Sequence, residues 1–297
     1  MLYLKQFQFL DWRTDERFIN DILETYHSTY YPFAFFPDMG LEQLTFAPIT
    51  LLCGGNGSGK TTALNVIAEK LAAKRNAPFN VSPLFPDYVR LCRYMRDPRC
   101  TRPFPVEIIT SDDVFDFIFN LRDFNEGVDG RRKELVERWY AVRGAEPDGF
   151  QLRSMDDYFA LADRNQRRKS TKSAYVRENL SANIRTHSNG ESALLYFLTR
   201  IRPDGLYLMD EPENSLSADS QKELALFLEN ACRFDRCQFI ISTHSPFLQS
   251  LRGAKLYDMD KRPVAPTHWT ELENVRTLHE FFRAHDGEFV PHESDSE

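Results

Sequence analysis

Apolar and polar positions along the chain predict strands that alternate with helices. Apolar residues at helical spacing predict helices over residues 62–74 and 220–234. Strands that alternate with helices are typical of an α/β fold with a mostly parallel sheet and helices on both faces. Short apolar runs bounded by turn residues predict the strands, at residues 3–10, 44–53, 106–110, 205–209 and 238–242.

Two segments depart from this alternation. Residues 30–37 are rich in aromatic side chains and hold two prolines, which predicts a connection without helix. Residues 112–186 are heavily charged and mostly helical in pattern, so we expect an inserted helical lobe. The predicted organisation is a core formed by residues 1–111 and 188–285, a lobe at 112–187 and an acidic tail at 286–297.

Composition narrows the class of protein. Apolar residues make up 42% of the 297 positions and charged residues 27%, as in ordinary globular proteins. No apolar run approaches the roughly 18 residues that span a bilayer, so we expect a soluble cytoplasmic protein with no membrane contact. The five cysteines form no Cys-x-x-Cys pair, which indicates reduced thiols. A net charge of −7 argues against a wholly basic nucleic-acid wrapper but leaves local basic patches open.

A glycine-rich loop between a predicted strand and a predicted helix carries the strongest chemical signal. Glycines let successive N–H groups point at phosphates, and the helix adds its positive amino end. We expect Lys60 to contact the β- and γ-phosphates of ATP, the Thr61 hydroxyl to bind Mg²⁺, and Thr62 to lie beside them. The loop matches G-x-x-x-x-G-K-[ST] with Gly54, Gly55, Asn56, Gly57, Ser58, Gly59, Lys60 and Thr61.

Acidic residues and a histidine follow the next predicted core strands. We expect Asp210 to position Mg²⁺ and Glu211 to orient and deprotonate the attacking water. His244 follows a further strand, and the carboxyl ends of parallel strands meet at one sheet edge. We therefore expect His244 to hold the γ-phosphate and the attacking water. Solvated acids and a packed histidine are the alternatives for each motif taken alone.

A short polar segment precedes an apolar helical pattern at residue 193. Ser188 and Glu191 have the spacing of a capping box. A cap does not need Gly190, which would let a backbone approach a phosphate closely. Cap and anion site are the same physical object, so both interpretations hold together.

This set of motifs resembles the ATP-binding-cassette (ABC) class of P-loop ATPases. The phosphate loop, an S-x-G-E signature at 188–191, D-E-P-E at 210–213 and a switch histidine at 244 occur in that order. Residues 213–217 are similar to the dimer-contacting loop of the class. Within it, the chain is similar to chromosome-maintenance, RecF-like and overcoming-lysogenization-defect ATPases. The resemblance implies two subunits around two ATP molecules, with Ser188 and Gly190 acting on the partner's nucleotide.

The chain departs from the class in three ways. Residues 61–150 contain no glutamine, and the strand that should end in one ends in Thr110-Ser111-Asp112-Asp113. Either one of those acids senses metal and water, or the role is missing. The signature is not the transporter form L-S-G-G-Q, and no heptad array predicts a coiled-coil arm.

Two basic clusters bear on partners. Arginines recur every three residues from Arg90 to Arg102, so a helix would place the first three on one face. A second cluster runs from Arg164 to Lys172 within the charged block. Either is a solvated surface, a nucleic-acid contact or a contact with an acidic partner. Trp12 and Arg13, after the first strand, are weighed as an adenine contact against simple packing.

The sequence thus predicts an ATPase that uses ATP with Mg²⁺ to close a homodimer and hydrolysis to open it, in DNA repair or phage defence. The alternative is a nucleotide-gated binding module that controls a nuclease, toxin or other effector. A transporter motor subunit is a third interpretation, disfavoured by the signature form, the missing glutamine and the charged lobe.

Overall fold

The computed structural model describes residues 2–22, 30–79, 81–121 and 189–289, with a few more positions between 130 and 137. It divides into two compact units, residues 1–115 with 189–297 and residues 116–188. Residues 111–121 are helical, as the charged pattern predicts. The rest of the predicted lobe lies almost wholly outside the described residues, so its architecture stays a prediction.

A six-stranded sheet forms the centre of the first unit, in the order β5-β6-β7-β3-β8-β9. Adjacent strands are parallel from β5 to β8, and β9 runs antiparallel to β8. All residues of β3 and β7 are buried, because helices cover both faces of the parallel strands. The strands are β3 Ile49–Cys53, β5 Val106–Thr110, β6 Leu206–Asp210, β7 Gln238–Thr243, β8 Lys255–Asp258 and β9 Ala265–Thr267.

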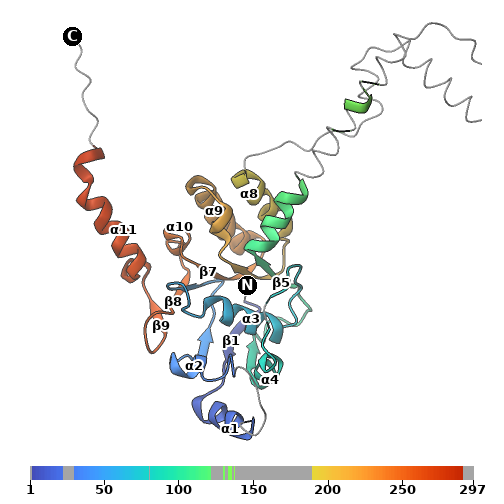
Figure 1. Ribbon diagram of the computed structural model, residues 1–297, viewed down its shortest axis with the longest axis vertical. Coiled ribbons are helices and arrows are strands. Elements are labelled where there is room, and N and C mark those ends of the chain that lie inside the picture. Colours follow the sequence, from blue (N-terminus) through green and yellow to red (C-terminus); the bar gives the residue numbers. More distant parts are fainter. Residues whose placement is uncertain are drawn as a thin grey trace, which may run out of the picture. The chain divides into compact units, whose positions relative to one another are not determined.

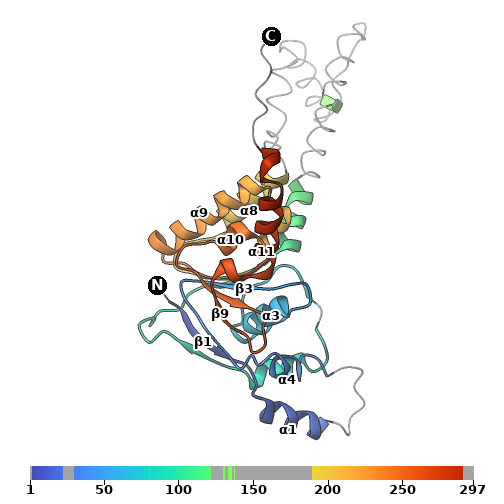
Figure 2. The same cartoon turned by 90° about the vertical axis from the view of Figure 1, so that its left-hand side faces the viewer.

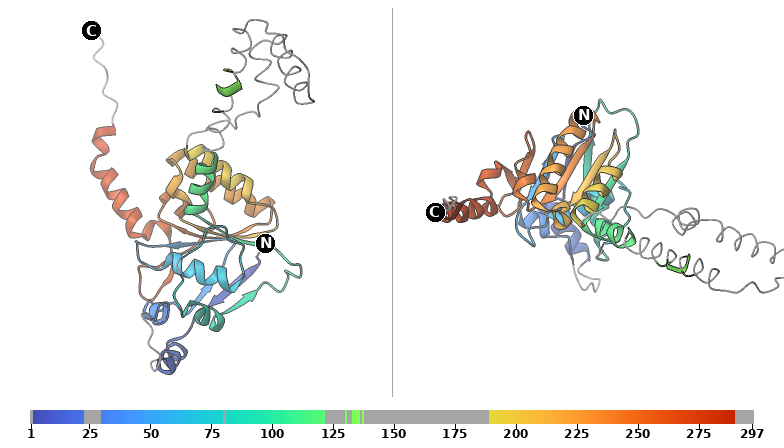
Figure 3. Two further views of the ribbon diagram at one scale, coloured as in Figure 1. Left: turned by 45° about the vertical axis from the view of Figure 1, so that its right-hand side comes forward. Right: turned by 90° about the horizontal axis from the view of Figure 1, so that it is seen from above.

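Helices lie on both faces of this sheet (Figures 1 and 2). Figure 2 shows α8, α9 and α10 on one face and α3 on the other, and in Figure 3 α8 and α9 lie side by side over the strands. The helices are α1 Trp12–Ile22, α2 Phe35–Asp38, α3 Lys60–Lys70, α4 Phe85–Leu91, α8 Asn189–Arg200, α9 Ala218–Phe234, α10 Pro246–Gln249 and α11 Glu273–Ala284, with short 3-10 helices η1 Pro212–Ser215, η2 Trp269–Glu271 and η3 Asp286–Phe289. The α/β fold class is confirmed, as are the predicted strands at 106–110, 205–209 and 238–242. The single strand predicted at 44–53 is wrong, because this segment forms two strands, β2 Gln43–Thr45 and β3, which belong to different sheets.

The first unit also contains a three-stranded antiparallel sheet. The sequence predicted its first strand but not the sheet. Its order is β2-β1-β4, with β1 Leu4–Gln8, β2 Gln43–Thr45 and β4 Arg93–Arg96. The predicted arginine face on a helix is wrong, because α4 ends at Leu91 and β4 pairs with β1. Arg90 pairs with Asp87 at 3.4 Å and Arg99 with Asp97 at 2.8 Å, so carboxylates of the same chain offset part of the charge.

Two helical segments also differ from the sequence pattern, namely α3 and the aromatic connection. α3 begins at Lys60 and ends at Lys70, four residues before the predicted end, and Ala72 then adopts a left-handed backbone with φ 51°. The aromatic connection contains one helical turn, α2, despite its prolines. Pro37 lies in the first turn of α2, where a backbone N–H has no acceptor within the helix, so its ring is tolerated.

No helix among the described residues is long and apolar enough to cross a membrane.

Candidate functional site

The register of the sheet brings the predicted motifs to one edge. Cys53, at the end of β3, pairs with Thr243 at the end of β7, and Ser242 pairs with Asp210 at the end of β6. The phosphate loop follows β3, the acids end β6, and His244 follows β7. Three strands therefore deliver three motifs to the same carboxyl edge, where open α/β sheets bind ligands.

The glycines of the phosphate loop have backbone or packing demands that other residues do not meet. Gly57 and Gly59 have φ of 81° and 87°, in the left-handed region that disfavours a Cβ. A Cβ on Gly59 would also lie 2.5 Å from Cε1 of Phe35. The Ser58 hydroxyl is buried with no hydrogen-bond partner in the described structure. The loop is therefore a backbone cradle with unused polar capacity, as a phosphate site requires.

Lys60 bends back over the loop. Its Nζ donates to the carbonyls of Gly54 at 3.0 Å and Gly55 at 2.9 Å, and lies 3.9 Å from Oε1 of Glu211. Only 4% of the side chain is exposed. Burial lowers the pKa of Lys60, while the negative charges of Glu211, Asp260 and Asp210 oppose that shift. The ammonium group of Lys60 is thus held between loop carbonyls and the Glu211 carboxylate, beside the backbone cradle.

A hydroxyl and a carboxylate meet beside the first turn of α3. Thr61 Oγ1 donates to Oδ1 of Asp210 at 3.0 Å, and the Ser242 hydroxyl donates to the same oxygen. Burial raises the pKa of Asp210, and the two hydroxyl hydrogen bonds counter that rise. Hard oxygen ligands of this kind, few in number and next to a phosphate site, fit Mg²⁺.

Glu211 and His244 form a second pair across the site. Nε2 of His244 lies 3.1 Å from Oε1 of Glu211, and both side chains are about one-third exposed or less. Glu211 adopts a left-handed backbone, φ 47° and ψ 56°, which turns the chain sharply after β6. Asn214 Nδ2 donates to the other Glu211 oxygen at 3.0 Å. The Glu211 carboxylate and the His244 imidazole are thus held together, partly exposed to solvent, and Glu211 lies next to Lys60.

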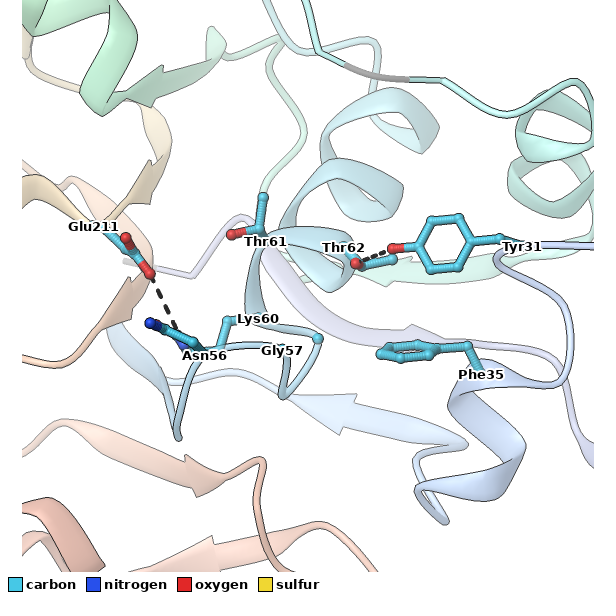
Figure 4. Close-up of a pocket in the computed structure, with 9 residues that line it drawn as sticks. Tyr31, Phe35, Asn56, Gly57, Lys60, Thr61, Thr62 and Glu211 are labelled. Carbon is cyan, nitrogen blue, oxygen red and sulfur yellow. Dashed lines mark hydrogen bonds and ion pairs between the residues drawn. The ribbon is translucent and has the colours of Figure 1, made fainter. Parts of the chain in front are cut away.

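A cavity of about 340 Å³ is lined by Glu211, the phosphate loop and the first turn of α3, together with two aromatic side chains, Tyr31 and Phe35. In Figure 4, Glu211 and Thr61 lie on one side of the phosphate loop, and Tyr31 and Phe35 lie on the other. The hydroxyls of Tyr31 and Thr62 are hydrogen-bonded. Aromatic faces beside a phosphate loop offer a stacking surface for a flat base.

A family model matches part of the chain. Residues 150–250 match the family described as "AAA domain, putative AbiEii toxin, Type IV TA system". No curated protein matches the chain. The chain carries the sequence motifs of a P-loop ATPase on a mostly parallel α/β sheet.

Solved structures similar to this chain include chromosome-maintenance heads and an ATP-binding cassette. The SMC head domain from Thermotoga maritima is 14% identical with a TM-score of 0.40, over 89% of this chain and 99% of that one. The Smc head with an extended coiled coil from Pyrococcus furiosus, bound to the C-terminal domain of ScpA, is 14% identical with a TM-score of 0.37, over 81% and 95%. A dimeric ATP-binding cassette with ADP and Pi is 13% identical with a TM-score of 0.32, over 73% and 83%.

The other predicted site residues differ in which cavity they line and in whether they lie among the described residues. Asn56, Gly57, Gly59, Lys60, Thr61 and Thr62 line the cavity with Glu211, whereas Gly54 and Gly55 line a neighbouring one with His244. Gly190 lies in the first turn of α8, and Ser188 lies outside the described residues. The cluster from Arg164 to Lys172 also lies outside them.

Two sequence-based candidates are not at the cavity. Trp12 starts α1, is 56% exposed, and is not among the residues that line the cavity. Asp113 accepts hydrogen bonds from the N–H groups of Ala77 and Thr110, and its own N–H donates to Thr110 Oγ1 at 3.4 Å, so Thr110 and Asp113 form a capping box at the start of the helix after β5. The structure therefore gives Asp113 a local structural role, and the question of the missing glutamine stays open for Asp112.

Three features of the site went unassigned in the sequence. Asp260 Oδ2 accepts from the loop N–H of Gly55 at 2.6 Å, although 205 positions separate them. Tyr31 and Phe35 belong to the aromatic segment, whose composition was visible but has no motif spacing. Glu213 stands in the D-E-P-E motif, but its contacts at the end of β7 depend on tertiary structure.

Proposed function

We propose that the chain binds ATP with Mg²⁺ at this sheet edge and hydrolyses it, with ATP binding closing a homodimer and hydrolysis opening it. The observation that carries the proposal is the convergence of Lys60, Glu211 and His244. The Glu211 carboxylate, placed to act on water, lies within 4 Å of both the Lys60 cation and the His244 imidazole, and the three come from separate elements. Phosphoryl transfer to water requires such positioning more than covalent chemistry.

Each side chain has a defined task in this proposal. Lys60 exchanges its loop carbonyls for the β- and γ-phosphate oxygens when ATP binds. Thr61 and Asp210 hold Mg²⁺, which would neutralise charge on those oxygens. Glu211 accepts a proton from the attacking water, and the His244 imidazole steadies the carboxylate and the γ-phosphate side of the site. Phe35 and Tyr31 provide the surface for the base.

A second subunit is proposed because one chain leaves the cavity unfinished. Among the residues that the structure describes, the lining comes from Tyr31, Phe35, the phosphate loop, the first turn of α3 and Glu211, and none of it comes from α8. The signature segment at the start of α8 is the part that the ABC class places on a partner's nucleotide. Closure by a second copy would exclude water and strengthen contacts to the γ-phosphate.

The proposed cellular role rests mainly on the description of the matched family. The matched family is described by a toxin–antitoxin system, which supports phage defence ahead of DNA repair. The same description favours the second candidate, a nucleotide-gated module that holds or releases an effector. Arg93 and Arg96 are both exposed on β4, and these side chains support nucleic acid as a third candidate partner.

Two variants test the proposal. Lys60→Ala should abolish ATP binding, because the cation on the phosphates is lost. Glu211→Gln should bind ATP but slow hydrolysis by a factor on the order of 10² or more, as expected for a lost general base. Sedimentation of Glu211→Gln should show a dimer with ATP and not with ADP. Hydrolysis by Glu211→Gln at the wild-type rate would refute the assignment.

Turnover of the wild type and effector binding by Glu211→Gln together distinguish the candidate roles. Wild-type turnover that rises with nucleic acid supports a repair-type ATPase. Negligible turnover under all conditions, with an effector retained on Glu211→Gln in ATP and released in ADP, supports the gated module.

A further inference from the structure

The end of β7 leaves backbone groups that the sheet does not satisfy. The last pair of β7 with β3 is Thr243 with Cys53, so the N–H groups of His244 and Ser245 lie beyond the ladder. Such groups need another acceptor when they are removed from water. Oε1 of Glu213 accepts from His244 N at 2.5 Å, from Ser245 N at 3.1 Å and from Thr243 Oγ1 at 2.8 Å.

We propose that Glu213 is a positioning residue that sets the place of His244 over the nucleotide site. One carboxylate oxygen gathers the N–H groups on both sides of the His244 α-carbon, so it fixes the direction in which the imidazole leaves the backbone. The geometric part of this proposal stands on these hydrogen bonds alone. Its consequence for turnover rests on the proposed function of His244.

The turn that carries Glu213 also carries Glu211. The backbone N–H of Glu211 donates to the Ser242 carbonyl at 3.1 Å, so the turn is fixed to β7 at its start as well. Glu213 and Glu211 therefore hold His244 from two sides, one through its backbone and one through Nε2. A change at Glu213 alters the separation of the Glu211 carboxylate and the imidazole without removing either group.

The position of the acceptor oxygen matters in this arrangement more than the charge of Glu213. Its second oxygen, Oε2, is buried and has no hydrogen-bond partner in the described structure. A glutamine can place its carbonyl oxygen where Oε1 lies and its amide group where Oε2 lies. The proposal therefore predicts that glutamine replaces Glu213 and that alanine does not.

The decisive experiment compares Glu213→Ala and Glu213→Gln. Glu213→Ala should bind ATP within about twofold of the wild type while kcat falls about 10-fold to 100-fold, the effect of a small misplacement of catalytic groups. Glu213→Gln should recover kcat to within about threefold of the wild type. An alanine variant with wild-type kcat, or a glutamine variant as slow as alanine, would overturn the proposal.

A second measurement does not depend on turnover. Hydrogen exchange of the His244 amide should speed up about tenfold or more in Glu213→Ala and return to the wild-type rate in Glu213→Gln. The Ser245 amide also donates to Thr243 Oγ1 at 3.0 Å and should change less. Unchanged exchange in Glu213→Ala would overturn the proposal even in a protein that does not hydrolyse ATP.

Gln238 offers a matched control at the opposite end of β7. Its buried Oε1 accepts from the N–H groups of Tyr3 at 2.7 Å and Leu4 at 2.9 Å. Gln238→Ala should lower stability while leaving kcat per folded molecule unchanged, so general loosening of β7 is distinguished from misplaced His244. Loss of kcat in Gln238→Ala equal to that in Glu213→Ala would contradict a local positioning role.

Measuring Glu211→Gln in parallel distinguishes failure of the proposed function from failure of the positioning role of Glu213. No difference between Glu211→Gln and the wild type counts against the proposed function. A slow Glu211→Gln beside a fully active Glu213→Ala counts against the positioning role alone.

Discussion

At the scale of single residues, Asp15 on α1 is a carboxylate with an incomplete set of hydrogen bonds. It is 2% exposed, its Oδ2 accepts from Ala34 N at 2.7 Å, and its Oδ1 has no partner in the described structure. Burial raises the pKa of Asp15 to about 6, with smaller contributions from nearby Asp38 and Asp11. The N–H that it holds belongs to the residue before Phe35, so Asp15 supports the aromatic wall of the cavity.

Asp15 should make the protein less stable as the pH rises. The pKa is higher in the folded state, so the native protein binds the proton more tightly. The contribution to stability is therefore full below about pH 4 and is lost as the pH rises through about 6. Asp15→Asn keeps an acceptor for Ala34 without the charge, and should raise the free energy of unfolding at pH 7.5 by about 1 to 3 kcal/mol. Urea unfolding at pH 5 and pH 7.5 measures the change.

Asp97 provides the opposite case. Hydrogen bonds from Arg99 hold the pKa of Asp97 down at about 2, so its charged form is the favoured one. Asp97→Asn should therefore lower stability at pH 7.5. A gain of stability in Asp97→Asn would contradict the role of the Arg99 hydrogen bonds, and no gain in Asp15→Asn would contradict the role of burial at Asp15.

At the scale of elements, α11 is fixed to the catalytic edge by its first turn. Asn274 Nδ2 donates to the His244 carbonyl at 2.9 Å and to Gln249 Oε1 at 3.1 Å. Beyond that turn α11 extends away from the sheet (Figure 3), and Phe281 and Phe282 are more than half exposed. The order of α11 therefore depends on few contacts, and Asn274 makes two of them.

Replacement of Asn274 should release α11. Asn274→Ala removes two hydrogen bonds, each worth about 0.5 to 1.5 kcal/mol, so amide exchange over α11 should speed up by roughly one to two powers of ten. Arg276→Ala is the control, because Arg276 lies two residues further along α11 and is exposed. It should leave exchange within twofold of the wild type. Equal protection of α11 in Asn274→Ala and the wild type would show that other contacts hold the helix.

The sequence predicted elements where a local pattern determines structure. β3, β6 and β7 are apolar runs buried on both faces, and the phosphate loop has a fixed motif, so both were recognisable. β4 was not, because Arg93, Tyr94, Met95 and Arg96 are all exposed and pair with β1 only through tertiary contact. The links of Asp260 and Asn274 to the site join segments far apart in sequence, and no spacing rule predicts such links.

At the scale of the whole molecule, the shared-site proposal makes a prediction about mixtures. Ser188→Arg should bind ATP without hydrolysing it, and Lys60→Ala should do neither. In a one-to-one mixture, half of the dimers are mixed and each has one intact site, so activity should return to about one quarter of the wild type. The measurement is steady-state ATP hydrolysis of each variant and of the mixture at equal total protein.

A second mixture supplies the control. Lys60 and Glu211 lie 3.9 Å apart within one chain, so both serve the same phosphate loop. Lys60→Ala mixed with Glu211→Gln leaves no dimer with an intact site and should regain nothing. Recovery in this control, or none with Ser188→Arg, would contradict a site shared between two chains.

The pairing of β5 with β6 has a consequence for how the family can diversify. These neighbouring parallel strands meet in register from Val106 with Leu206 to Thr110 with Asp210, yet residues 111–205 separate them in the chain. The ladder holds both ends of that connection, and doubling its length costs only about 0.6 kcal/mol in closure entropy. Insertions and deletions between β5 and α8 can therefore accumulate during evolution while the acids at the end of β6 keep their place. Relatives should differ most in length here, and new partner specificities can arise here without altering the nucleotide chemistry.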